Sequence, residues 1–261
     1  MKNSRLLVAL AAALTFALVV VPAASARRSA AQLTVFAAAS LNAVLPQIDS
    51  TQKYSFAGSD ALQAQITLGA PADVYLAAST VGPEALYAAG KCSKPVVFAR
   101  NRLVLVTPAN NPAGIRSIYD LKRPGVRVLI GTPTVPIGSY TRQVLRNVGL
   151  LSAIQPQVVS QEKDVATIAA KIKLGAADAG FVYVTDALAA GTGLVALPLP
   201  SWAQPPVKYE GCVVTASANQ ADAAAFLKKL STKAAQAKFT AAGFLLPKVP
   251  ATPVKPVKKK T

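Results

Sequence analysis

The sequence contains no histidine, and this absence removes the commonest machinery of catalysis. A Ser-His-Asp arrangement, a histidine general base and a histidine metal ligand are all excluded. Acidic residues are scarce, at 11 of 261, and none form a D-x-D or E-x-x-E cluster. This scarcity disfavours carboxylate metal sites and hydrolases with paired carboxylates. Neither a Walker phosphate loop nor a G-x-G-x-x-G turn occurs. We therefore expect no enzyme, no cofactor and no directly bound metal.

Cysteine is nearly absent too, with Cys92 and Cys212 as the two in the chain. They lie far apart in the sequence, and neither has a C-x-x-C neighbour of the metal-binding kind. In an oxidising compartment they can form one disulfide, and the alternative is two buried free thiols. The sequence leaves both open because it does not give the distance between them.

The amino-terminal segment, residues 1–26, has the pattern of a secretory signal peptide. Lys2 and Arg5 precede an apolar run, and Ala24-Ser25-Ala26 follows it as an A-x-A cleavage site. The small residues at the exit argue against an uncleaved membrane anchor. No cysteine follows the run, so a lipid anchor is not indicated. We expect a periplasmic or otherwise extracytoplasmic protein.

Positive charge dominates, with a formal net charge of +17. Removing Lys2 and Arg5 leaves +15, and removing the five lysines of residues 248–261 leaves +10. This Lys/Pro-rich tail is predicted to be disordered. No basic patch is interleaved with aromatic residues, so nucleic-acid binding is not expected. The general field of such a protein attracts anions.

Apolar strands alternate with amphipathic helices along the chain, which is typical of an α/β fold with mostly parallel sheets. The predicted strands are 33–38, 53–58, 72–79, 102–108, 126–131 and 179–184. Helices are expected after Ser40 and Ser59 and at 81–89, 139–150 and 164–175.

Two Pro-rich stretches, near residue 108 and near residue 207, interrupt this alternation. They predict two lobes, one made of 31–107 plus 208–247 and the other of 108–207. In such a two-lobed architecture the ligand lies in the cleft between lobes, near the carboxyl ends of strands.

Ser40 and Ser59 each follow a predicted strand and open a predicted helix. A serine there places its hydroxyl beside the unpaired N–H groups of the first helical turn. Donors and helix dipole together favour an anion. Each serine alone is more simply explained as a helix cap, but two after neighbouring strands of one lobe indicate a shared anion site.

Several segments resemble periplasmic molybdate-binding proteins, the solute receptors of molybdate ABC transporters. The matching segments are VFAAASL, FAGSDALQAQITLGAPADVYLAAS, NRLVLVTP, VPIGSYTRQVL, EKDVATIAAKI and AGFVYVTDAL, in the family's order from about Leu33 to Leu246. The resemblance implies a type II periplasmic-binding-protein fold with two lobes. It also implies a monomeric receptor that delivers its oxyanion to a membrane permease.

The resemblance further implies a ligand set, carried over position by position. Ser40 and Ser59 correspond to the family's two serine ligands, Ile137 and Val165 to its two backbone N–H donors, and Tyr183 to its tyrosine. Between the two serines the chain is shorter than usual for the family, and Ile137 replaces a commonly smaller residue.

Neutral donors suit a fully deprotonated tetrahedral dianion, because such an ion offers only acceptors. Molybdate, tungstate and sulfate meet this description, whereas phosphate keeps a proton near neutral pH and needs an acceptor. Asp164 is the nearest carboxylate, and we expect it to orient its loop. We predict a molybdate- and tungstate-binding receptor, in which cavity size rejects sulfate.

Three alternatives remain open at this point. The first is a receptor for sulfate or another oxyanion. The second is an exported serine-dependent hydrolase, whose general base would have to be Lys53, Lys163 or Asp164. The third is a cationic adhesive protein that binds cell-surface polyanions through its tail.

Overall fold

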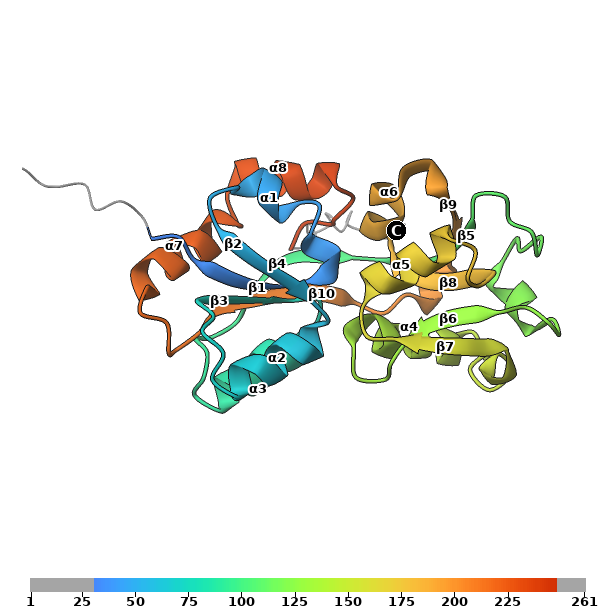
Figure 1. The fold of residues 1–261 in the computed structure, drawn as a ribbon, viewed down its shortest axis with the longest axis horizontal. Helices are drawn as coiled ribbons and strands as arrows, with labels where there is room; N and C mark the ends of the chain where they lie inside the picture. Colours follow the sequence, from blue (N-terminus) through green and yellow to red (C-terminus); the bar gives the residue numbers. More distant parts are fainter. Residues whose placement is uncertain (1–30, 248–261) are drawn as a thin grey trace, which may run out of the picture. The chain divides into compact units, whose positions relative to one another are not determined.

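The computed structural model describes residues 31–247, so the predicted signal peptide (1–26) and the predicted disordered tail (248–261) lie outside the described residues. Figure 1 shows two lobes, each built on a five-stranded sheet flanked by helices. The strands of the first sheet, in spatial order, are β2 (Lys53–Ala57), β1 (Thr34–Ala38), β3 (Val74–Ala77), β10 (Val207–Val213) and β4 (Val96–Asn101). Those of the second are β7 (Val158–Glu162), β6 (Val128–Gly131), β8 (Ala179–Tyr183), β5 (Leu103–Pro108) and β9 (Leu194–Pro198).

Helices cover both sheets because parallel strands need a crossover segment to return to the same edge. In the first lobe α2 and α3 lie on one side of the sheet and α1 and α8 on the other (Figure 1). The helices are α1 (Leu45–Ile48), α2 (Ser59–Thr67), α3 (Val81–Ala88), α4 (Pro136–Asn147), α5 (Val165–Lys173), α6 (Val184–Ala189), α7 (Gln220–Lys229) and α8 (Lys233–Ala241). Among the described residues, no helix is long and apolar enough to span a bilayer.

The two sheets are mixed, although the sequence predicted mostly parallel ones. In each sheet the first three strands pair in parallel, and the fourth pairs antiparallel with both of its neighbours. The fourth strands, β10 and β5, are the ones that enter directly from the other lobe. With no helical crossover before them, they are not constrained to run parallel to their neighbours.

The predicted boundary of the first lobe at residue 107 is corrected by the strand pairing. β5 pairs with β8 and β9 in the second sheet, so the chain crosses between lobes at Arg102. The Pro-rich stretch that suggested the boundary is a turn inside the second lobe. Asn111 stabilises this turn by donating from its side chain to the carbonyl of Ile115 and accepting from the N–H of the same residue. The return crossing lies just before β10.

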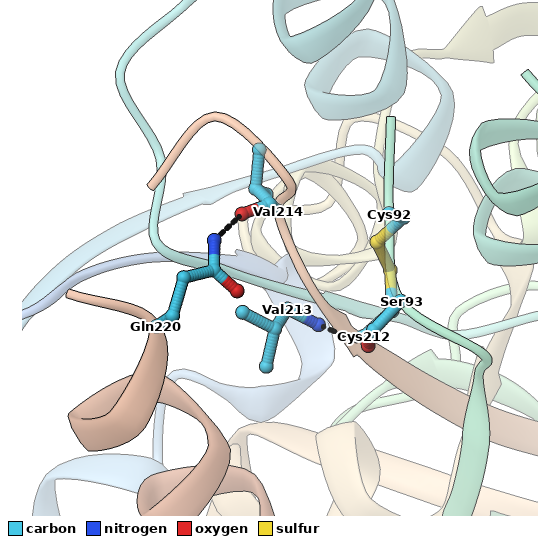
Figure 2. Close-up of a disulfide and its surroundings, with 6 residues drawn as sticks. All are labelled: Cys92, Ser93, Cys212, Val213, Val214 and Gln220. Carbon is cyan, nitrogen blue, oxygen red and sulfur yellow. Dashed lines mark hydrogen bonds between the residues drawn. A yellow bond between two sulfur atoms is a disulfide. The ribbon is translucent and has the colours of Figure 1, made fainter. Parts of the chain in front are cut away.

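Cys92 and Cys212 form a disulfide in the first lobe, with their Cα atoms 5.9 Å apart (Figure 2). It joins the segment after α3 to β10, which is the strand that returns from the second lobe. Around it, the N–H of Val213 donates to Ser93 Oγ, and the side-chain amide of Gln220 donates to the Val214 carbonyl (Figure 2). The alternative of two free thiols is therefore not what the structure contains.

Candidate functional site

A small pocket lies between the lobes, where the carboxyl ends of six strands converge. β1, β2 and β3 contribute from the first sheet, and β6, β7 and β8 from the second. The enclosed volume is about 10 Å³, close to what a single water molecule needs. This is far below the roughly 300–1,000 Å³ usual for organic ligands and favours a compact ion. The lining residues are Ala38, Ala39, Ser40, Ala57, Gly58, Ser59, Ala78, Val135, Pro136, Ile137, Asp164, Val165 and Tyr183.

All five residues of the predicted ligand set line this pocket. Ser40 and Ser59 come from the first lobe, and Ile137, Val165 and Tyr183 come from the second. The shorter segment between the two serines does not separate them, because both lie in the same pocket wall. Whether these residues hold a ligand stays a prediction, but the geometry required for it is present.

Neither serine caps its helix, contrary to the simpler of the two interpretations. The residue before Ser59, Gly58, is the N-cap of α2, and the short 3-10 helix that contains Ser40 begins after Ala38 with no side-chain cap. The hydroxyl of Ser59 instead accepts from the N–H of Ala78 at 3.1 Å. The Ser40 hydroxyl bonds to the hydroxyl of Tyr209 at 2.7 Å. The helical N–H groups beside both serines therefore stay available to a ligand.

Two further helix beginnings meet the pocket from the second lobe. α4 starts with Pro136, which has no N–H, so the N–H of Ile137 is its first available donor. α5 starts at Val165 and is capped by Asp164, whose carboxylate accepts from the N–H of Thr167 at 2.7 Å. First-turn N–H groups have no acceptor within their own helix. The expected role of Asp164 in orienting this loop matches its capping bond.

Tyr183 is the last residue of β8 and is 1% exposed. Within the described part of the chain, its hydroxyl has no hydrogen-bond partner. Burial raises the pKa of Tyr183 well above its ordinary value, so the phenol keeps its proton and can act only as a neutral group. A buried hydroxyl without a partner costs stability, and such groups are rare unless they serve a purpose.

The pocket carries little formal charge despite the basic composition of the chain. No lysine or arginine is among the lining residues, and Asp164 is the single charged residue there. The amino ends of α2, α4 and α5, each at least nine residues long, supply partial positive charge. The arrangement can therefore hold an anion through oriented dipoles rather than through an ion pair.

The lobes touch each other beside the pocket. Thr134, in the loop before α4, donates its hydroxyl proton to the carboxylate of Asp60 on α2 at 2.6 Å. Gly58 lies so close to the carbonyl of Lys163 that a Cβ atom would overlap that oxygen. Both contacts join one lobe to the other, so this arrangement is closed around the pocket.

Sequence reasoning did not identify three residues that shape this site, namely Gly58, Ala78 and Tyr209. Gly58 stood within the quoted AGS segment, and a close backbone approach is a common reason for glycine at such a point. Ala78 supplies only a backbone N–H, for which a sequence gives no indication. Tyr209 contacts Ser40 across 169 positions of sequence.

A pocket of neutral donors between two lobes, each with a mixed sheet, defines a two-lobed solute-binding protein. Residues 6–245 match the family described as "Bacterial extracellular solute-binding protein". The chain belongs to this family, which confirms the predicted class and two-lobed α/β fold.

The relatives narrow the class further. The molybdate-binding protein ModA of Mycobacterium tuberculosis (strain ATCC 25618 / H37Rv) is 36% identical over 230 residues, which cover 84% of this chain and 87% of that protein. Among solved structures, the periplasmic molybdate-binding protein of Azotobacter vinelandii has a TM-score of 0.75 and 26% identity, covering 83% of this chain and all of that one. The sulfate-binding protein SubI of Mycobacterium tuberculosis H37Rv has a TM-score of 0.73 at 20% identity, covering 82% and 86%, and shows a shared fold.

Proposed function

We propose that this protein captures molybdate, and tungstate with it, outside the cytoplasm and delivers it to an ABC importer. The observation that carries the proposal is the donor character of the pocket. Ser40, Ser59 and Tyr183 offer hydroxyls, and Ile137 and Val165 offer backbone N–H groups. The unpartnered, buried phenol of Tyr183 supports a ligand oxygen as its partner. The relationship to proteins named for molybdate binding supports the identity of the ion.

The chemistry of these donors matches a tetrahedral dianion without a proton. Each oxygen of such an ion only accepts hydrogen bonds, and each proposed protein group can donate one. A protonated anion would leave its O–H facing donors, and an unsatisfied buried polar group costs about 1–3 kcal/mol. Oriented dipoles stabilise the negative charge without the desolvation cost of a buried cation.

Sulfate is the second candidate, because the fold is shared with a sulfate-binding protein and the hydrogen-bonding requirements are the same. Hydrogen bonding alone does not separate the two ions. Molybdate is the larger, so the size of the cavity has to discriminate, and Ile137 is the largest aliphatic side chain among its lining residues, followed by Val135 and Val165. Measured preference between these ions therefore decides between the candidates.

A serine-dependent hydrolase is disfavoured by the surroundings of both serines. The hydroxyl of Ser40 bonds to a tyrosine, and that of Ser59 accepts from a backbone N–H. Of the three possible bases, Asp164 caps α5 through one carboxylate oxygen, and Lys53 and Lys163 are both exposed. Serine activation needs a base within hydrogen-bonding reach, and neither serine has one among the described residues.

The proposed mechanism is closure of the two lobes around the ion. Each lobe supplies part of the donor set, so the complete set exists only when the lobes meet. Two short crossings at Arg102 and before Val207 connect them and serve as the hinge. The closed receptor, exported as a monomer, then presents the ion to the membrane permease.

A competitive titration with molybdate, tungstate, sulfate and phosphate tests this function. We expect molybdate and tungstate to raise the unfolding temperature and bind most tightly, sulfate to bind less tightly, and phosphate to give no shift. No shift with any of the four ions would refute the proposal. Tighter binding of sulfate than of molybdate would establish the second candidate instead.

The variant Tyr183→Phe tests the site itself. It should weaken molybdate binding by about 1–3 kcal/mol, because one donor to the ion is lost. It should not lower the unfolding temperature without ligand, since the hydroxyl has no partner to lose. Tyr119→Phe, at an exposed tyrosine of the second lobe, is the matched control. Equal affinities of Tyr183→Phe and the control would exclude Tyr183 from the ligand set.

A further inference from the structure

A chain of buried polar side chains leads away from Ser40 toward the hinge. The Ser40 hydroxyl bonds to Tyr209, whose oxygen lies 3.4 Å from the side-chain nitrogen of Asn101. The same nitrogen donates to the hydroxyl of Thr185 at 3.0 Å. All four residues are at most 5% exposed. Asn101 ends β4 at the first crossing, and Tyr209 lies in β10 just after the second.

The direction of these hydrogen bonds is fixed by one backbone contact. The side-chain oxygen of Asn101 accepts from the N–H of Arg102 at 2.8 Å, and this bond identifies the oxygen and the nitrogen of the side-chain amide. The amide nitrogen of Asn101 can only donate hydrogen bonds, so the phenol oxygen of Tyr209 must accept from it. The phenol proton then has one remaining partner, which is the Ser40 oxygen at 2.7 Å.

Ser40 therefore receives a hydrogen bond from Tyr209, and its own proton is directed elsewhere. The other side of Ser40 faces the pocket. Burial raises the pKa of Tyr209 well above its ordinary value, which keeps the donating proton in place. The ring of Tyr209 also packs edge-on against Tyr183, with centroids 5.9 Å apart, so one residue contacts both a first-lobe and a second-lobe member of the ligand set.

We propose that Asn101 and Tyr209 form a donor relay that holds Ser40 as a hydrogen-bond donor and so makes the pocket select anions without a proton. Both are positioning residues, because they act on the ion through Ser40. This inference rests on the proposed oxyanion-binding function and adds the residues that set its selectivity. Ser59 is also left to act as a donor, because its oxygen already accepts a hydrogen bond from the N–H of Ala78.

The test compares two anions that differ in a proton and share a charge. At mildly alkaline pH selenate carries no proton, whereas arsenate carries one, and both are tetrahedral dianions. Their affinity ratio is measured by competition against molybdate in the full-length mature protein. In the wild type we expect selenate to bind more tightly, by roughly 5- to 150-fold, the factor that corresponds to one unsatisfied polar group.

Two variants alter the relay. Asn101→Asp presents an acceptor to Tyr209, so the phenol proton turns toward residue 101 and Ser40 donates to the phenol instead of to the ion. The selenate-to-arsenate ratio should fall at least severalfold, and the added negative charge cancels from the ratio because both ions are dianions. Tyr209→Phe keeps the ring and removes the donor, so the ratio should fall less and molybdate binding should weaken.

The control Tyr54→Phe removes another hydrogen-bonded phenol, one that donates to the carbonyl of Asp49 away from the pocket. It should leave the ratio at the wild-type value. A general loss of stability would change both affinities together and would not move the ratio. If the relay variants fold but keep the wild-type selenate-to-arsenate ratio, the relay is refuted. The proposed molybdate-binding function is not affected by that result. Failure of the wild type to bind molybdate or selenate overturns the proposed function itself.

Discussion

Gly58 is the residue at which a single added methyl group should separate folding from ligand binding. It is the N-cap of α2, with φ −58° and ψ 137°, and alanine adopts these angles without strain. In the closed arrangement, however, a Cβ atom at this position overlaps the carbonyl oxygen of Lys163 and lies 3.5 Å from Cγ2 of Val135. Both of those atoms belong to the other lobe, so the methyl group acts as a wedge between lobes. The third near atom, Asp60 Oδ1 at 2.9 Å, is the end of a flexible side chain of α2 and can turn away.

The size of the expected loss of affinity depends on the kind of atom that the added methyl group contacts. A backbone carbonyl does not rotate away as a flexible side chain does, so either the lobes stay apart or the packing is strained. Inserting a methyl group into a packed contact costs about 1–3 kcal/mol, which corresponds to a roughly 5- to 150-fold loss of affinity for molybdate. Without ligand the open protein avoids this cost. There, the stiffer unfolded chain should stabilise by about 0.4–1 kcal/mol, but alanine is a poorer N-cap than glycine by a similar amount, so the two effects nearly cancel.

The assay combines calorimetric titration with molybdate and thermal unfolding without it. For Gly58→Ala we expect weaker binding together with a ligand-free unfolding temperature within about 3 °C of the wild-type value. Ala61→Ser changes an exposed position in the same turn of α2 and should alter neither quantity. Unchanged affinity of Gly58→Ala would refute the reasoning. So would a ligand-free unfolding temperature that falls in step with the affinity, since the contact would then belong to the ligand-free state as well.

Three other perturbations have defined outcomes. Replacing Cys92 and Cys212 by serine removes a link that closes 120 positions of sequence, so chemical denaturation should show a loss of about 5 kcal/mol of unfolding free energy in the chain-entropy account. Burial raises the pKa of Asp186 from 3.8 to about 7, so the folded state binds this proton more tightly than the unfolded state, and stability falls as pH rises from about 4 to 7. Asp186→Asn should remove this part of the pH dependence and be the more stable protein above pH 7. Thr134→Ala deletes the interlobe bond to Asp60 and should weaken molybdate binding by about 0.5–1.5 kcal/mol without a change in ligand-free unfolding temperature.

The sequence was sufficient to predict residues whose surroundings are local. Ser40 and Ser59 follow apolar strands directly, so the end of the strand and the start of the helix locate them. Tyr183, Ile137 and Val165 were obtained from the family resemblance, because a strand-end tyrosine or a backbone N–H carries no pattern of its own. The structure places all five around one pocket, two on the first lobe and three on the second, which no local rule could establish.

Contacts between distant parts of the chain were beyond prediction. Asn101 and Tyr209 are 108 positions apart, and each looks like an ordinary strand residue until the two crossings bring β4 and β10 together. The lobe boundary was misplaced for a similar reason. A Pro- and Asn-rich stretch predicts a turn but not which side of a domain boundary the turn belongs to, and only the pairing of β5 with β8 decides that.

In the proposed mechanism, the lack of a lysine or arginine among the pocket-lining residues is what couples binding to closure. A lysine or arginine on one lobe would hold an anion by its own charge, and much of the affinity would then be present before the lobes met. Oriented N–H and O–H groups are weaker one by one, and here they are divided between the carboxyl ends of β1, β2 and β3 and those of β6, β7 and β8. A ligand shifts a conformational equilibrium only by the difference between its affinities for the two states. Dividing neutral donors between the lobes makes that difference large, so the closed form marks the loaded receptor for the partner that unloads it.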